Sequence, residues 1–304
     1  MIVSIGEILF DMFPTHKRMG GAPFNFAFHL KKLGFPVRFI SRVGFDPDGE
    51  DIISYLKQEG FYPSDVQIDP NYKTGSVIVN LDEKGVPDFE ILPDAAFDHI
   101  KLSKTLLLAG KVPVDLVYFG SVFQRTKKAS SLFSDFIRKK DKQTKCMCDI
   151  NLRKGCFDKT LVSSCLTHAD ILKLNLDELN IIKEMNGFTG KNDAFIKNMM
   201  KTYDIEMVAV TKGADGSEII KNGKHYTVLC FDSNFEIADT VGAGDGFSAV
   251  LAVGYLKKWK PDKIMSVATD FAKEICKIRG AVPEEDSFYQ VFRPLFGNGE
   301  KPDD

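Results

Sequence analysis

A glycine-rich loop followed by a strongly apolar stretch is the part of the sequence best suited to chemistry. Residues 239–247 are DTVGAGDGF, and residues 248–256 are almost entirely apolar. An apolar stretch of this kind predicts a buried helix, and small residues let the N–H groups at its start approach a ligand closely. The helix dipole adds partial positive charge at the same end. The segment therefore predicts a buried site for an anion such as a phosphoryl group.

Asp245 is the acidic residue within this predicted anion site. A carboxylate repels a phosphate there unless it has a task of its own, and one such task is to accept a proton from an attacking hydroxyl group. The alternative is that Asp245 caps the buried helix, as Asp commonly does. The residue types alone leave both interpretations open, although capping does not account for the flanking glycines.

The familiar nucleotide-binding motifs are absent from the chain. It has no GxxxxGK[ST] segment, so a P-loop enzyme is excluded, and no GxGxxG segment follows the first predicted strand. The second absence disfavours an oxidoreductase built on a Rossmann-type sheet. No HExxH zinc motif and no HRD/DFG set of a protein kinase occurs either.

Short β-branched runs alternate with amphipathic stretches along most of the chain, which predicts an α/β fold. Such alternation implies a mostly parallel sheet with helices on both faces. We expect strands at 2–5, 37–40, 116–119, 145–150, 171–174 and 207–211, and helices at 22–33, 48–59 and from about 126. A hairpin turned at Asn222 and Gly223 is expected over 217–229.

Two segments interrupt this alternation, at 12–19 and at 74–92. The second alternates as extended chain, with a turn expected at 82–85. Such an insertion is either a decoration at a sheet edge or a flap over a site at the strand ends. We favour the flap, because the other insertion directly follows the first strand.

Composition sets limits on the class of protein. The chain has 304 residues, with 40 Lys and Arg against 42 Asp and Glu, so its formal net charge is −2. This balance argues against a nucleic-acid-binding protein that relies on a basic field. No run approaches the ~20 apolar residues of a membrane span, and the first residues do not resemble a signal peptide. We expect a cytoplasmic protein whose six cysteines are buried thiols; a metal site or disulfide among the four at 146–165 is the alternative.

The DTVGAGD segment resembles the C-terminal signature of the PfkB (ribokinase-like) carbohydrate kinases, and fructokinases are the most similar members. Further resemblances occur in family order over essentially the whole chain, at 20–25 (GGAPFN), 41–49 (SRVGFDPDG), 149–153 (DINLR), 175–178 (NLDE), 210–216 (VTKGADG) and 280–281 (GA). The resemblance implies one kinase domain over 1–304. Its fold would be a ribokinase-like three-layer α/β/α core with a mostly parallel sheet, plus a small discontinuous β lid at about 11–20 and 73–98.

The resemblance also implies roles for the glycine-rich loop. Asp245 would be the base that deprotonates a sugar hydroxyl. The backbone amides of Gly242, Ala243 and Gly244 would form the anion hole for the migrating phosphoryl group.

Five residues are implied in binding the sugar. Asp11 and Asn25 would hydrogen-bond its hydroxyl groups, as a carboxylate and an amide can, and Gly21 belongs to the same segment as Asn25. Phe97 would be an apolar lid residue. Arg153 would either reach a polar group of the substrate or pair with the aspartate of its own motif.

Other residues are implied in binding ATP, together with Gly242 and Gly244. Asn175, Thr211 and Gly213 would lie near the nucleotide, and Glu178 would act on Mg²⁺ through water. Asn175 and Glu178 also have the spacing of a capping box, and both interpretations can hold together.

Three positions qualify what the resemblance implies. Asp239 and Thr240 match residues that help to hold a monovalent cation in several relatives, which implies a K⁺ site in this chain. Thr269 stands where the family often has Asn or His near the adenine, which weakens any inference about contacts to the adenine ring of ATP.

The motifs favour D-fructose as the substrate, phosphorylated by ATP to fructose 6-phosphate. Kinases for another sugar or sugar acid, such as ribose or 2-keto-3-deoxygluconate, are the alternative, and a non-catalytic sugar-binding regulator is a further one. Since the lids of relatives often pair between subunits, a homodimer is expected. Neither a nucleic acid nor a membrane is an expected partner.

Overall fold

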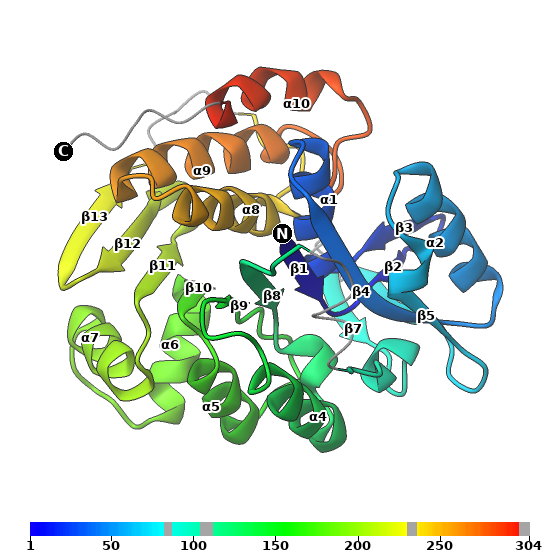
Figure 1. Cartoon of the computed structure of the whole chain (residues 1–304), viewed down its shortest axis with the longest axis horizontal. Coiled ribbons are helices and arrows are strands. Elements are labelled where there is room, and N and C mark those ends of the chain that lie inside the picture. Colours follow the sequence, from blue (N-terminus) through cyan, green and yellow to red (C-terminus); the bar gives the residue numbers. More distant parts are fainter. Residues whose placement is uncertain (82–86, 104–111, 230–235, 298–304) are drawn as a thin grey trace.

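A nine-stranded sheet forms the centre of the structure, a computed structural model that describes residues 1–81, 87–103, 112–229 and 236–297 (Figure 1). The strands from β11 to β5 are parallel, and an antiparallel hairpin completes one edge. In spatial order they are β13 (Lys224–Val228), β12 (Ser217–Lys221), β11 (Met207–Thr211), β10 (Ile171–Asn175), β9 (Lys145–Asp149), β8 (Leu116–Phe119), β1 (Ile2–Ile5), β4 (Val37–Gly44) and β5 (Val66–Asp69).

Helices cover both faces of this sheet, so the predicted three-layer α/β/α core is confirmed (Figure 1). Successive strand residues face opposite layers: Ile2 packs in one apolar core and Val3 in the other. One face carries α1 (Ala22–Lys32), α2 (Pro47–Gln58), α8 (Ala243–Leu256), α9 (Pro261–Cys276) and α10 (Ser287–Phe292). The other carries α4 (Lys127–Ile137), α5 (Lys159–Thr167), α6 (Leu176–Met185) and α7 (Asn192–Tyr203).

Helix α8 is buried as its composition predicts, since it packs against both α1 and α9. All residues from Gly246 to Gly254 in it are buried. A Cβ at Gly246 would lie 3.0 Å from the ring of Phe271 in α9, so the small residue allows the close contact between the two helices. This packing fixes the start of α8 inside the protein.

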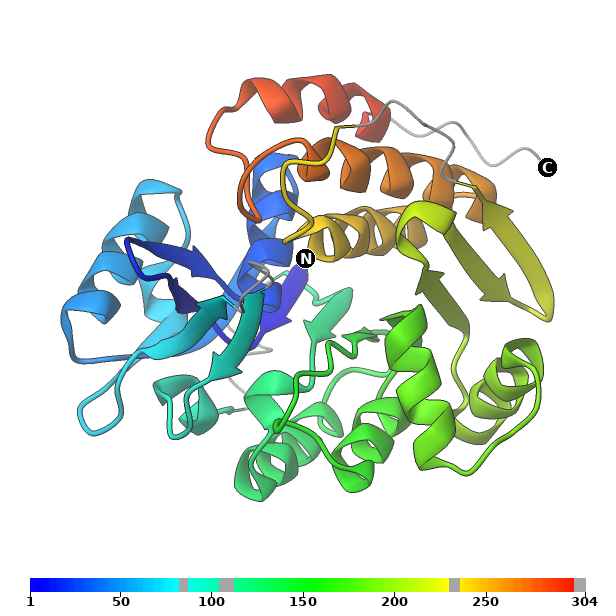
Figure 2. The ribbon, with the colours of Figure 1, turned by 180° about the vertical axis from the view of Figure 1, so that it is seen from behind.

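A separate four-stranded sheet lies beside the core, at the opposite end from β13 (Figure 2). It has the order β3-β2-β6-β7, from β3 (Lys17–Gly20), β2 (Leu9–Met12), β6 (Gly75–Leu81) and β7 (Pro87–Ile91). Strands β2 and β6 are parallel and the other pairs antiparallel. The two insertions that interrupt the α/β alternation therefore pair with each other. The turn expected at 82–85 lies outside the described residues.

The remaining elements are short or lie at the edges. Asn222 and Gly223 both have positive φ between β12 and β13, which confirms the predicted hairpin turn.

The four cysteines at 146–165 are buried free thiols. Within the described ranges, no helix has the length and apolar character needed to cross a membrane. Short 3-10 helices, η1 to η5, occupy Pro63–Asp65, Ala96–His99, Val122–Gln124, Gly213–Asp215 and Arg293–Phe296.

Candidate active site

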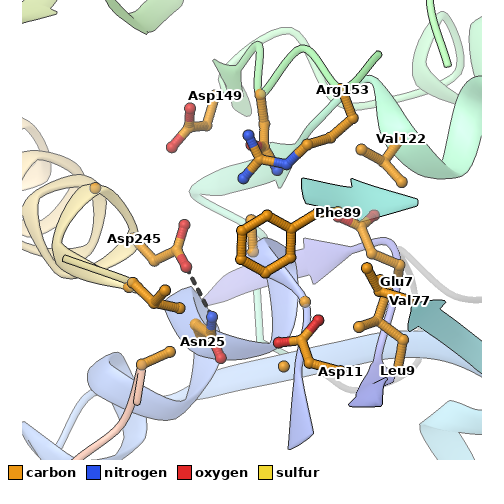
Figure 3. A pocket seen from close by; sticks show the side chains of 18 of the residues that line it. Glu7, Leu9, Asp11, Asn25, Val77, Phe89, Val122, Asp149, Arg153 and Asp245 are labelled. Atoms are coloured by element: carbon orange, nitrogen blue, oxygen red, sulfur yellow. Dashed lines mark hydrogen bonds between the residues drawn. The ribbon is translucent and has the colours of Figure 1, made fainter. Parts of the chain in front are cut away.

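A cavity of about 460 Å³ lies between the four-stranded sheet and the carboxyl ends of the central strands. Its walls come from the β1–β2 loop, all four strands of the smaller sheet, the residues at the ends of β9 and β10, and the start of α8. Open α/β sheets bind ligands at this edge, where loops and helix N-termini converge. Most of the side chains named below face this cavity (Figure 3).

Asp245 and Asn25 meet at the cavity because α1 packs against α8. The Asn25 amide donates a 2.7 Å hydrogen bond to Asp245 Oδ2 (Figure 3). Gly242 caps α8 with a φ of 82°, and a Cβ there would lie 2.4 Å from Ala281 Cα, so the turn requires glycine. Ala243 N–H forms only a long bond of 3.4 Å to the Thr240 carbonyl. The start of α8 thus offers backbone donors and a carboxylate to the same space.

Burial raises the pKa of Asp245 to about 7, and the nearby carboxylate of Asp149 acts in the same direction. The hydrogen bond from Asn25 and the charges of Lys173 and Arg153 oppose this rise. A carboxylate with this pKa exchanges a proton readily near neutral pH, which suits a general base.

Lys173 supplies a buried positive charge next to the glycine-rich loop. Its Nζ lies 3.1 Å from Asp149 Oδ2, and a Cβ at Gly244 would lie 2.9 Å from the same nitrogen. Ser248 and Tyr118 also donate hydrogen bonds to Asp149 Oδ2, at 2.8 and 3.2 Å. Burial lowers the pKa of Lys173, but the neighbouring carboxylates outweigh it and the net shift is upward. The ammonium group therefore stays charged beside the predicted anion hole.

Glu178 and Asn175 form the capping box of α6. Glu178 accepts backbone N–H bonds from Asn175 at 2.7 Å and from Leu152 at 3.0 Å, and it lines the cavity. Each carboxylate oxygen has a second lone pair, which can accept a hydrogen bond from a water molecule. These carboxylate oxygens can therefore accept hydrogen bonds from the water molecules of a hydrated Mg²⁺. Both interpretations of the NLDE segment are thus compatible with the geometry.

Polar side chains of the smaller sheet face the cavity from the other side. Asp11 on β2 lies opposite Arg18 on β3. Burial raises the pKa of Asp11 to about 6, while Arg153 and Arg18 lower it. Gly21 has a φ of 117°, and a Cβ there would lie 2.5 Å from the Glu7 carbonyl oxygen, so this glycine holds the β1–β2 loop against the start of α1.

Arg153 reaches into the cavity and makes no ion pair with Asp149, whose cationic partner is Lys173.

The aromatic side chain that faces the cavity is not Phe97, the residue expected from the sequence. The Phe97 ring is fully buried behind Gly75 and does not line the cavity. Phe89 on β7 faces the cavity instead, and its ring lies between Asp11 and Arg153 in Figure 3.

Two residues predicted to lie near the nucleotide are found at the end of β11 and in the turn after it. Thr211 pairs in register with Asn175 at the strand ends, and Gly213 is exposed in η4 directly after it. Neither lines the cavity.

The Thr269 hydroxyl lies 3.1 Å from the hydroxyl of Ser217, so this side chain joins α9 to β12.

Thr240 lines the cavity, whereas Asp239 is engaged by donors. Its Oδ2 accepts bonds from Gly280 N–H at 3.0 Å and from the Arg18 guanidinium at 3.4 Å, and its Oδ1 accepts one from Val241 N–H at 3.1 Å. A carboxylate surrounded by donors, one of them cationic, does not fit a monovalent cation, and we propose none at Asp239.

The model of the pfkB family carbohydrate kinases matches residues 6–286. The chain belongs to the pfkB family of carbohydrate kinases. It is a phosphotransferase that acts on a sugar hydroxyl. Among its relatives, the Pyrococcus horikoshii sugar kinase PH1459 is 30% identical over 84% of this chain and 83% of that protein. An Escherichia coli fructokinase is 29% identical over 82% of each chain.

One further relative and one solved structure are also similar to this pfkB kinase. A 5-dehydro-2-deoxygluconokinase of Clostridium tetani is 22% identical over 85% of this chain and 81% of that protein. The crystal structure of PH1459 in complex with ATP is similar with a TM-score of 0.75 and 28% identity, over 92% of this chain and 94% of that one.

The cavity residues of this pfkB kinase that were not predicted as site residues include Glu7, Lys173 and Phe89. Glu7 and Lys173 carry a weak sequence signal, because each is a charged residue within an apolar segment. Phe89 and Ile91 alternate along β7, and both face the cavity, which a period of two predicts.

Proposed function

We propose that this protein transfers the γ-phosphoryl group of ATP to the terminal hydroxyl of D-fructose. The observation that carries the proposal is the carboxylate of Asp245 at the N-terminus of a buried helix, bonded to Asn25 at 2.7 Å in a cavity that also contains Asp11. Fructose is supported by the 29% identity to the E. coli fructokinase. ATP is supported by the similar structure of PH1459, which is described in complex with ATP.

In the proposed reaction, ionised Asp245 accepts the proton of the sugar hydroxyl. The hydroxyl oxygen forms a bond to the γ-phosphorus, and the bond from that phosphorus to the bridging oxygen of ADP breaks. The N–H groups of Gly242, Ala243 and Gly244 and the helix dipole stabilise the charge on the phosphoryl group. Lys173 provides a fixed cation beside the same loop.

The nucleotide would extend from this loop toward Asn175, Thr211 and Gly213 at the ends of β10 and β11. Glu178 would hold Mg²⁺ through water molecules. When bound, Mg²⁺ supplies charge neutralisation for the phosphate oxygens.

The sugar would lie between the two sheets. Asp11 and the unpartnered Oδ1 of Asn25 would accept hydrogen bonds from its hydroxyls, and Arg153 would donate to a sugar oxygen. The four-stranded sheet would act as the lid, with Phe89 packing on the sugar. Pairing of two lids in a homodimer remains a prediction.

A sugar acid is the second candidate substrate, and the two guanidinium groups at the cavity favour it. Arg18 and Arg153 both line the cavity, and a guanidinium fork matches a carboxylate. The 22% identity to the 5-dehydro-2-deoxygluconokinase shows that the family includes kinases whose names refer to other substrates.

A panel of sugars in a coupled ADP assay tests the proposal. The panel contains D-fructose, D-ribose and 2-keto-3-deoxygluconate, each with saturating ATP and Mg²⁺. We expect the highest kcat/KM with D-fructose. Good turnover of another member with none on fructose would reject fructose and retain the kinase. No turnover with any member would reject D-fructose and both alternative substrates.

A further inference from the structure

Glu7 occupies the connection between the two sheets. It follows β1 of the core and precedes β2 of the smaller sheet, and it lines the cavity. Only 2% of its surface is exposed, and its Oε2 has no hydrogen-bond partner. A buried carboxyl oxygen without a partner is unfavourable in the free protein, so its position on the cavity wall points to a ligand.

The charged groups around Glu7 do not provide a dedicated counterion. Asp245 faces it from α8, Arg153 from the loop after β9, and Arg125 from the end of η3. Arg125 is already paired with Asp98 at 2.7 Å. Within the described residues, neither arginine forms an ion pair with Glu7. A carboxyl group buried without a counterion favours its neutral form, and a neutral acid donates a hydrogen bond.

We propose that Glu7 is a further substrate-binding residue, which as a neutral acid donates a hydrogen bond to an oxygen of the sugar. The inference rests on the proposed sugar site. Among the described residues that line the cavity, two buried side-chain atoms have no hydrogen-bond partner, Glu7 Oε2 and Asn25 Oδ1. Asn25 Oδ1 is an acceptor, and a protonated Glu7 adds a donor on the core side of the cavity. A hydroxyl group both donates and accepts, so a site with both kinds of partner holds it more tightly.

The arrangement also links sugar binding to the base. Burial raises the pKa of Glu7 to about 7, and Asp245 acts in the same direction. Burial raises the pKa of Asp245 to about 7 as well. Because two carboxylates repel each other when both are ionised, the charge on Asp245 favours the neutral form of Glu7. The productive form has its proton on Glu7 and its charge on Asp245.

Calorimetric titration of D-fructose without nucleotide, at pH 6 and pH 8, tests the proposal. Because the pKa of Glu7 is about 7, wild-type affinity should be about tenfold weaker at pH 8. Glu7→Gln keeps a donor that does not titrate, so its affinity should match the wild type at pH 6 and change less than about twofold by pH 8. Glu7→Ala should bind weakly at both values. Glu50→Gln, on the exposed face of α2, is the matched control.

Three results would overturn the proposal. These are a pH-independent wild-type affinity, a Glu7→Gln variant as weak as Glu7→Ala at pH 6, or a Glu7→Gln variant with the wild-type pH dependence. If wild type does not bind fructose but binds another panel sugar, fructose specificity fails and Glu7 is judged with that sugar.

The protonation state is measured without any ligand. The infrared difference spectrum between wild type and Glu7→Gln should contain the band of a protonated carboxyl at pH 6 and lose it at pH 8.5. Its absence at pH 6 would overturn the assignment even if no sugar binds.

Discussion

The side-chain amide of Asn25 donates a 2.7 Å hydrogen bond to Oδ2 of Asp245, a residue 220 positions away in the sequence. The contact exists because α1 and α8 pack on the same face of the central sheet. It orients one carboxylate oxygen and leaves the other, Oδ1, with no hydrogen bond to any described residue. Asn25 is therefore both a candidate sugar ligand and a positioning residue for Asp245, the proposed base.

Asn25→Ala should shift the pH dependence of catalysis. The hydrogen bond from Asn25 lowers the pKa of Asp245, so its loss raises that pKa above about 7. If Asp245 is the base, it acts only when ionised, so the acid limb of kcat/KM should move to higher pH by on the order of one unit. Asn198→Ala, on the exposed side of α7, is the control. An unmoved acid limb in Asn25→Ala would show that the bond does not tune the base.

Glu7→Gln should stabilise the protein at alkaline pH. The pKa of Glu7 rises from 4.5 to about 7 on folding, so between these values the folded state binds more protons than the unfolded state. The wild type therefore loses stability as the pH rises through this window, by about 3 kcal/mol in the limit, and the variant does not. Urea unfolding at pH 5 and pH 8.5 measures this: the two proteins should diverge only at pH 8.5. Equal stabilities at both values would contradict the account of Glu7.

Gly242→Ala should disrupt the start of α8. Its positive φ is unfavourable for alanine, and the added Cβ would lie 2.4 Å from Ala281 Cα, so the backbone must move. Gly187→Ala is a matched control, because Gly187 also has a positive φ but no atom lies within 4 Å of an added Cβ.

We expect Gly187→Ala to destabilise by about 1–2 kcal/mol with normal kinetics. Gly242→Ala should lose more stability and reduce kcat by at least about 10²-fold, the effect of losing one anion-hole donor. Thermal unfolding of both variants measures the loss of stability, and steady-state kinetics measure kcat. Normal turnover by Gly242→Ala would remove this loop from the phosphoryl site.

Lys173→Met should affect both stability and catalysis. It leaves Asp149 and Glu178 buried without their shared cation, and breaking a buried pair typically costs about 3–5 kcal/mol. The KM for ATP should rise and kcat should fall, while the affinity for sugar changes little. Lys197→Met, on the exposed face of α7, is the control, and its free energy of unfolding should lie within about 0.5 kcal/mol of the wild-type value. Unchanged KM for ATP and kcat in a folded Lys173→Met variant would limit the lysine to a structural role.

Local patterns in the sequence predicted the elements well. The helix expected at 22–33 is α1 (Ala22–Lys32), and the strand expected at 171–174 is β10 (Ile171–Asn175). These elements follow from periodicity and from breakers such as Gly34, which are properties of neighbouring residues. Asp245 and Asn25 were also predicted, because each lies in a local motif at the start of a helix.

The residues that were missed depend on how distant segments pair. Lys173 became a site residue because it lies beside Asp149 in the register of β9 and β10, which no local pattern specifies. Phe89 rather than Phe97 faces the cavity because β7 pairs with β6 and η2 packs behind the sheet. The family resemblance implied an apolar lid residue at Phe97, but only the register determines which ring faces the cavity.

The most direct test of the central claim is the kcat of Asp245→Asn, measured beside its affinity for sugar. Asp193→Asn, on the exposed side of α7, is the control for the same chemical change. If Asp245 is the base, kcat should fall by about 10²–10⁴-fold while the sugar dissociation constant changes only a few-fold. Turnover by Asp245→Asn within tenfold of wild type would contradict the assignment of Asp245 as the base.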